Sequence, residues 1–307
     1  MSAFHSSITS CDVIDYARGG VEDSIRKLLI GGKKPFVLRN YLSTIWADKC
    51  MLHWRDPSAL KSYLLSNGVR AGECIVKCEF GGNYMEKGMT IRSVCLLQLM
   101  DYFNHCETNA GKPDSHKAYL AQFSILNNEY SLLLDSVRPF PLDVINIIGK
   151  STDGRHSVDR AQDNLYNVNI WFNGVNSNKI TASPCHYDPF HNLLCQISGE
   201  KRVLLLSDEL HDCLYLHEGV QRNTSSVNFD VINIDGDDTR CSTDQLKEEG
   251  EEEMRKYPLL FSNTTRNPPV RASLAVLHPG DALYIPLRWM HYCKSHGRSM
   301  STNFWWL

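Results

Sequence analysis

Two imidazoles and one carboxylate, far apart in the chain, constrain the fold more than any other feature. His186 and Asp188 lie in the segment Ser-Pro-Cys-His-Tyr-Asp-Pro, and His291 ends the distant Trp-Met-His triplet. Residues two apart in a strand share one face of the pleat, so His186 and Asp188 point the same way at a strand end. His291 completes the set only if the fold brings a second segment against the first.

This residue set has the composition of a facial triad. Three protein ligands on one side of a metal leave positions for a co-substrate and dioxygen, an arrangement that suits non-haem Fe(II). Zinc accepts the same ligand types, and the sequence does not separate the two metals. A His-x-Asp pair between Pro184 and Pro189 also occurs by chance as part of a turn. The pair alone is therefore weak evidence for a metal site, and the surrounding residues must support it.

A lysine follows the first two ligands in an apolar stretch. Residues Asn192–Leu206 are predicted to form two short, buried strands around a Ser-Gly turn, with Lys201 just past the turn. A lysine that enters such a core needs an anionic partner, because an unpaired buried ammonium is costly. The distal carboxylate of a 2-oxo acid would be that partner. The alternative is a Lys201 at a hairpin end with its amine in water.

These segments resemble the JmjC domain of Fe(II)/2-oxoglutarate oxygenases. The run Pro279–Pro286 and the closing Asn-Phe-Trp-Trp segment fit the same pattern. The chain is most similar to the small, JmjC-only, cupin-like branch, which includes protein arginyl and asparaginyl hydroxylases and the tRNA wybutosine hydroxylase. The resemblance extends from about Lys33 to the C-terminus.

The resemblance implies a role for each matching residue. The iron ligands would be His186, Asp188 and His291, and Lys201 would bind the far carboxylate of 2-oxoglutarate. Four more side chains match positions that hydrogen-bond this co-substrate, although a structural hydroxyl is an equal alternative for Tyr and Ser: Tyr119, Ser183, Asn192 and Asn303. Three aromatic residues would line the substrate pocket, with ordinary packing as the alternative: Trp171, Trp289 and Trp305.

The resemblance also implies the architecture. We expect a mainly β chain with helices (α+β), built on a double-stranded β-helix of the jelly-roll, cupin type. Residues 1–115 would be an N-terminal helical and strand region that packs on the barrel. Residues 116–307 would be the JmjC domain, with an acidic insertion near 218–257 that is too long for an ordinary loop.

Local patterns give more detailed predictions. The apolar spacing of residues 8–30 predicts a helix, and so does that of residues 91–103. Residues 34–38 and 73–80 have strand composition. Asp56-Pro57 precedes a helical pattern that continues to Leu65, so a capped helix is expected there.

Composition agrees with an enzyme of the nucleus or cytoplasm, or both. The net charge of −3 gives no sign of strong attraction to nucleic acid or membrane. No run of eighteen apolar residues and no secretory signal pattern is present, so no membrane association is expected. The 11 cysteines are odd in number and scattered, which favours reduced thiols.

The resemblance implies oxidation of an unactivated C–H bond, with Fe(II) as cofactor and 2-oxoglutarate and O2 as co-substrates. We expect hydroxylation of a protein side chain, Arg, Lys or Asn. The acidic insertion would recruit a basic ribosomal or histone segment, or would simply be solvated. A tRNA substrate is disfavoured by its acidity. Histone lysine demethylation ranks lower because the sequence shows no PHD-type zinc finger, and a silent cupin-like binding module is opposed by the intact ligand set.

Overall fold

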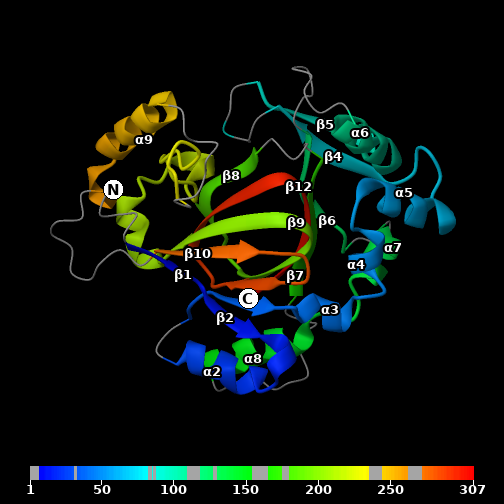
Figure 1. Cartoon of the computed structure of the whole chain (residues 1–307), viewed down its shortest axis with the longest axis horizontal. Helices are drawn as coiled ribbons and strands as arrows, with labels where there is room; N and C mark the ends of the chain where they lie inside the picture. The colour runs from blue at the N-terminus through cyan, green and yellow to red at the C-terminus, as the bar shows by residue number, and fades with distance from the viewer. Residues whose placement is uncertain are drawn as a thin grey trace.

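Twelve strands among the described residues form one continuous hydrogen-bonded sheet that curls into a barrel (Figure 1). The computed structural model describes residues 7–30, 33–81, 85, 88–108, 118–126, 130–153, 165–174, 180–234, 244–261 and 272–307. Along the main path the strand order is β2-β3-β11-β9-β12-β7-β6-β4-β5, while β1 pairs with β10, β10 with β9, and β8 with β12. The strands are β1 Ile8–Ser10, β2 Asp12–Asp15, β3 Phe36–Arg39, β4 Ile75–Phe80, β5 Thr90–Cys95, β6 Ala118–Ser124, β7 Leu165–Asn173, β8 Ile180–Tyr187, β9 His191–Leu206, β10 Ala272–Leu277, β11 Ala282–Ile285 and β12 Met290–Trp306.

Two long strands give the barrel its shape. The first part of β9 pairs with β11 and its second part with β10, while β12 runs antiparallel to both parts. Gly199, at φ +71°, lies between these parts, and the pairing with β12 shifts register there. The prediction of two short strands around a Ser-Gly turn is therefore wrong. The partner strand continues on both sides of Gly199, so the glycine bends one strand instead of reversing the chain.

The predicted fold class is confirmed: the chain is an α+β protein whose long antiparallel strands form a jelly-roll type barrel. The N-terminal residues supply strands at both ends of the main path, because β2 and β3 lie at one end and β4 and β5 at the other. The domain boundary expected at residue 115 falls within 109–117, outside the described residues.

Helices pack against the sheet through the largest hydrophobic cluster. Trp46 and Trp54 are fully buried in the largest hydrophobic cluster, which also contains Phe172 and Phe304 from the sheet. In Figure 1 these helices lie around the lower and right-hand sides of the barrel. The helices, with the short 3-10 turns, are η1 Tyr16–Arg18, α2 Val21–Leu29, α3 Tyr41–Ile45, α4 Cys50–His53, α5 Pro57–Ser66, α6 Leu96–Thr108, α7 Ser131–Ser136, α8 Leu142–Asp153, η4 Asp208–Cys213, η5 Gly219–Gln221, α9 Asp244–Lys256 and α10 Pro258–Phe261.

Two local helix predictions need correction. Only Val21–Leu29 of residues 8–30 is α-helical, because β1 pairs with β10 and β2 with β3. Likewise Thr90–Cys95 pairs with β4, and the helix begins at Leu96. In both places long-range pairing overrides a helical apolar period. The helix capped by Asp56 is confirmed, since its carboxylate accepts a hydrogen bond from the Ala59 amide at 2.7 Å.

The acidic insertion is largely folded. Its residues Val227, Phe229 and Ile232 are buried in a cluster that includes Tyr292 of β12. Glu253 of α9 is also buried, and its carboxylate accepts a hydrogen bond from the Asn228 amide at 2.7 Å. The prediction of a solvated insertion therefore fails for this part, because an apolar face and a buried carboxylate anchor it. The acidic run 235–238 lies outside the described residues.

Candidate functional site

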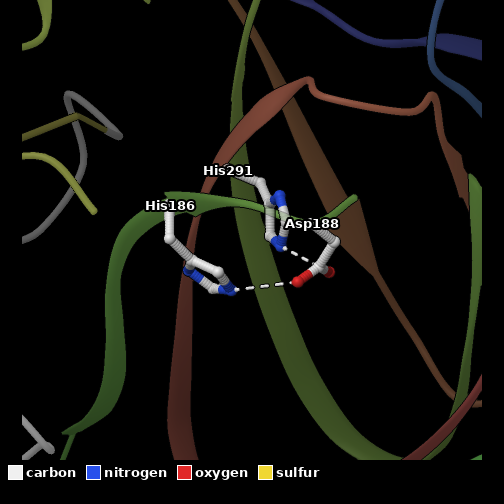
Figure 2. Close-up of side chains that lie close together, drawn as sticks. All are labelled: His186, Asp188 and His291. Atoms are coloured by element: carbon white, nitrogen blue, oxygen red, sulfur yellow. Dashed lines mark ion pairs between the residues drawn. The ribbon is translucent and has the colours of Figure 1, made fainter. Parts of the chain in front are cut away.

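The three predicted metal ligands meet at one end of the barrel (Figure 2). His291, at the start of β12, is the register partner of His186 near the end of β8, and Asp188 follows that strand. The Nε2 atom of His186 lies 3.8 Å from Oδ1 of Asp188, and Nε2 of His291 lies 3.6 Å from Oδ2. One ligand atom from each residue lies within 4.8 Å of the other two. Distances of this size leave room for an ion bound by all three.

Both imidazoles are oriented for metal binding by their own strands. Nδ1 of His186 lies 2.7 Å from the carbonyl oxygen of Pro184, and Nδ1 of His291 lies 3.1 Å from that of Trp289. A carbonyl only accepts, so each Nδ1 carries the proton and donates it. Each Nε2 therefore presents a lone pair to the centre, which is the form that binds a metal.

Burial keeps His291 neutral. Loss of solvent, helped by nearby His186, lowers the pKa of His291 to about 4, while Asp188 acts in the opposite direction. A neutral imidazole needs no proton release before it binds a cation. The donor set of two neutral nitrogens and one carboxylate fits Fe(II), and it also fits zinc.

Lys201 is buried close to this centre. Its side chain is 4% exposed, and Nζ donates a hydrogen bond to Oγ of Ser301 at 2.6 Å. Burial lowers the pKa of Lys201 to about 8, although Cys293 opposes this shift. Among the described residues no carboxylate forms an ion pair with Lys201. The alternative of an amine in water is therefore wrong, and the ammonium is available to an anion that enters the site.

A narrow cavity connects Lys201 with the metal ligands. Its volume is about 30 Å³, which exceeds the roughly 10 to 15 Å³ that one water molecule needs. All predicted co-substrate residues line this cavity with the three ligands and Lys201: Tyr119, Ser183, Asn192 and Asn303. The structure thus brings together every residue of that set. Ser301, which sequence reasoning missed, lies two positions before Asn303 and so on the same face of β12.

Two of these amides form a directional chain of hydrogen bonds. Nε1 of Trp171 donates to Oδ1 of Asn303 at 3.0 Å, and Nδ2 of Asn303 donates to Oδ1 of Asn192 at 3.1 Å. Nδ2 of Asn192 then lies 3.5 Å from Oδ2 of Asp188. The chain links the wall of the cavity to the carboxylate of the predicted metal ligand Asp188, so it restricts how that side chain can turn.

A wider cavity of about 580 Å³ adjoins the first and shares Tyr119, Trp171, Ser183, His186 and Asp188 with it. Trp171 and Trp305 line this outer cavity, as predicted from the resemblance. Trp289 lines neither cavity and packs on the hydrophobic cluster around Leu205 and Leu283. Its predicted pocket role is therefore corrected: Trp289 precedes β12 and turns toward that cluster.

Two residues stand out among those of the outer cavity that sequence reasoning missed. Glu79, near the end of β4, lines it, and burial raises the pKa of this carboxyl. Gln122 lies at a bulge of β6 with φ +48°, an unusual conformation for a residue other than glycine. No local motif signals either residue, because each reaches the cavity only through the pairing of β4, β6 and β7.

The sequence comparisons agree with this geometry. The profile of the family described as "Cupin-like domain" matches residues 23–307. The chain is 27% identical over 299 residues to Jumonji C domain-containing protein 5 of Drosophila melanogaster, covering 97% of this chain and 60% of that relative. It is 34% identical over 140 residues to lysine-specific demethylase 8 of Danio rerio, covering 45% of this chain and 27% of the relative.

A third relative is named for a different activity. The chain is 34% identical over 121 residues to tRNA wybutosine-synthesizing protein 5 of Homo sapiens, covering 39% of this chain and 29% of the relative. The chain spans 60% or less of each of these three proteins. Within the described part of the chain, none of the helices combines the length and apolar character needed to cross a membrane.

Proposed function

We propose that this chain, which belongs to the cupin-like, JmjC domain family, is an Fe(II)- and 2-oxoglutarate-dependent oxygenase that hydroxylates an Arg, Lys or Asn side chain of a protein. One observation carries the proposal. His186, Asp188 and His291 converge between a narrow cavity that contains a buried ammonium and a wide cavity that can admit a substrate. A zinc site of purely structural role would need neither cavity.

The residues divide the work between them. When bound, the iron with 2-oxoglutarate and dioxygen supplies the oxidising power for an unactivated C–H bond. Lys201, with Ser301, would hold the distal carboxylate of the co-substrate. Tyr119 and Ser183 would add hydrogen bonds to it from the cavity wall. The protein thus binds and orients the reactants around the centre.

The outer cavity favours a cationic substrate side chain. Glu79 is a partly desolvated carboxylate there, and burial alone raises its pKa. No ion pair of Glu79 occurs among the described residues, so a guanidinium or ammonium from the substrate would supply the missing partner. This favours Arg or Lys over Asn as the hydroxylated residue.

The exposed face of α9 would help to recruit a basic segment, such as a ribosomal or histone tail. Glu251 and Glu252 are exposed there, whereas Glu253 is buried and anchors the insertion. Electrostatic attraction between this acidic face and a basic segment would affect the encounter with the substrate and its binding. Changing Glu251 and Glu252 to Gln should therefore raise KM for a basic peptide and leave kcat unchanged.

A second candidate function is oxidation of a hypermodified tRNA base, as the name of the human relative suggests. Three aromatic rings form a continuous stack at the outer cavity: Trp305 with Phe190 at 5.4 Å between centroids, and Phe190 with Tyr166 at 4.1 Å. Tyr166 is 59% exposed, and its outer face offers a surface for a planar base. Lysine demethylation, suggested by the zebrafish relative's name, would use the same centre.

One assay separates these functions. Purified protein with Fe(II) and 2-oxoglutarate is incubated with Arg-, Lys- and Asn-containing basic peptides, with methylated histone peptides, and with tRNA from cells that lack the chain. Mass spectrometry then detects gain of one oxygen or loss of a methyl group. Product from a basic peptide supports the proposal. Product from tRNA and from no peptide would instead favour oxidation of a tRNA base. Turnover that survives Asp188→Ala would refute an iron-dependent reaction at this centre, and a silent binding module would give no product.

A further inference from the structure

A histidine outside both cavities contacts two segments that lie next to the proposed metal ligands in the chain. His211 belongs to η4, the short turn that follows β9. Its Nε2 atom lies 2.9 Å from the carbonyl oxygen of Arg288, three residues before the ligand His291. Its ring also stacks on Tyr187, which lies between the ligands His186 and Asp188, with centroids 4.9 Å apart and an interplanar angle of 19°.

Arg288 completes a closed set of contacts. Its Nη2 atom lies 3.2 Å from Nδ1 of His211, and its guanidinium lies over the Tyr187 ring, 5.1 Å from the centroid. One neutral tautomer of His211 satisfies both polar contacts: Nε2–H donates to the Arg288 carbonyl, and Nδ1 accepts from the guanidinium. The His211 ring makes both polar contacts and the stack in one orientation, so His211, Arg288 and Tyr187 hold one another in place.

The backbone at Arg288 explains why such support is needed. Arg288 has φ +66°, in the left-handed region that residues with a side chain avoid. Its amide donates to the carbonyl of Asp188 at 3.2 Å, and its carbonyl accepts from His211. The strained residue therefore ties the Asp188 turn directly to the segment that leads into His291. A strained backbone conformation of this kind is kept only where several surrounding contacts fix it.

We propose that His211 is a positioning residue for the metal centre, and that His211, Tyr187 and Arg288 form a clasp that fixes the Asp188 turn against the His291 turn. The ring touches neither metal ligand and lines neither cavity. Its effect passes through backbone contacts to two of the three ligands. The inference rests on the proposed metal site, because the clasp matters only if these residues bind an ion.

The clasp predicts a specific change in metal affinity. His211→Ala removes the stack and both polar contacts, so the two turns sample more conformations before the ion binds. We expect Mn²⁺, used as a redox-stable probe, to bind about fivefold more weakly, a smaller effect than loss of a partner bonded directly to a ligand. His211→Gln retains an amide that can donate to the Arg288 carbonyl, so it should recover part of the affinity. His211→Phe retains only the stack and should resemble His211→Ala.

His53 provides a matched control. It stacks on Tyr63 with centroids 4.4 Å apart and an interplanar angle of 16°, and neither residue lines a cavity. His53→Ala removes an equivalent stacked ring, so any loss of affinity that it causes would reflect general loosening of the fold.

The experiment is a titration of each metal-free protein with Mn²⁺, in which electron paramagnetic resonance measures the free ion. Circular dichroism checks that each variant is folded. A selective loss of affinity in His211→Ala, with partial recovery in His211→Gln, supports the clasp. Wild-type affinity in His211→Ala, or equal losses in His211→Ala and His53→Ala, overturns it. Absence of Mn²⁺ binding in the wild type, with the same result for His186→Ala, would instead overturn the proposed metal function.

Discussion

His186 and His291 face each other as register partners of two antiparallel strands, and each Nδ1 donates to the carbonyl two residues before it. Strand pairing thus sets the separation of the two imidazoles, and the backbone sets their tautomers. Asp188 lies beside both through a turn that His211 and Arg288 support. The ligand geometry is therefore a property of the folded chain itself.

Burial of His291 makes stability depend on pH. The pKa of His291 is lowered from 6.5 to about 4 in the fold, so the unfolded chain binds more protons between these values. Metal-free protein should lose stability as pH falls from about 6.5 toward 4, by on the order of 2 to 3 kcal/mol from this group. Denaturant unfolding at several pH values measures the loss. His291→Gln should have a smaller loss over that range, and an identical loss would contradict the assignment.

Binding of 2-oxoglutarate should weaken at alkaline pH. Burial lowers the pKa of Lys201 to about 8, and the co-substrate needs the ammonium form. The Kd should be nearly constant below pH 7 and should rise about tenfold per pH unit above 8, because binding then requires uptake of one proton. Calorimetric titration with Mn²⁺ present measures this slope. Lys201→Arg retains the charge at all these pH values, so whatever affinity it has should lack the slope.

Glu79 should control the charge preference of the outer cavity. Glu79→Gln removes the negative charge with little change of shape, so KM for an arginine peptide should rise about tenfold or more. Steady-state kinetics on the peptide that gives product measures the change. Glu200→Gln is a matched control, because Glu200 lies on β9 and pairs with Arg202 away from both cavities. Equal effects of the two substitutions would argue against a cationic substrate.

Two glycines have the same φ angle, so alanine substitutions at both positions distinguish the cost of backbone strain from the cost of steric crowding. Gly199 and Gly219 both have φ +71°. A Cβ at Gly199 would lie 2.0 Å from the carbonyl oxygen of Arg298, whereas nothing lies within 4 Å of one at Gly219. Gly219→Ala should cost about 1 kcal/mol and Gly199→Ala about 3 kcal/mol or more in the free energy of unfolding. Denaturant unfolding tests this, and equal costs would show that β9 and β12 do not approach closely at this bend.

The candidate metal ligands could be proposed from sequence because their signal is local. His186 and Asp188 follow a two-residue strand period, and Lys201 stands out as a charge in an apolar run. Glu79 and Gln122 carry no such signal, because they reach the outer cavity through strand pairing with β6 and β7. Sequence periodicity misassigned residues 8–15 for the same reason: their partners, β10 and β3, lie elsewhere in the chain.

The most direct test of the proposed function is an anaerobic titration of the metal-free protein with Fe(II) and 2-oxoglutarate. The weak visible charge-transfer band of the iron chelate reports joint binding. Lys294→Ala is the matched control for Lys201→Ala, since Lys294 is also a buried lysine of the barrel but lines neither cavity. A band that forms in the wild type and Lys294→Ala and weakens in Lys201→Ala is the predicted result. A folded wild-type protein that gives no band would contradict the oxygenase function and favour a silent binding module.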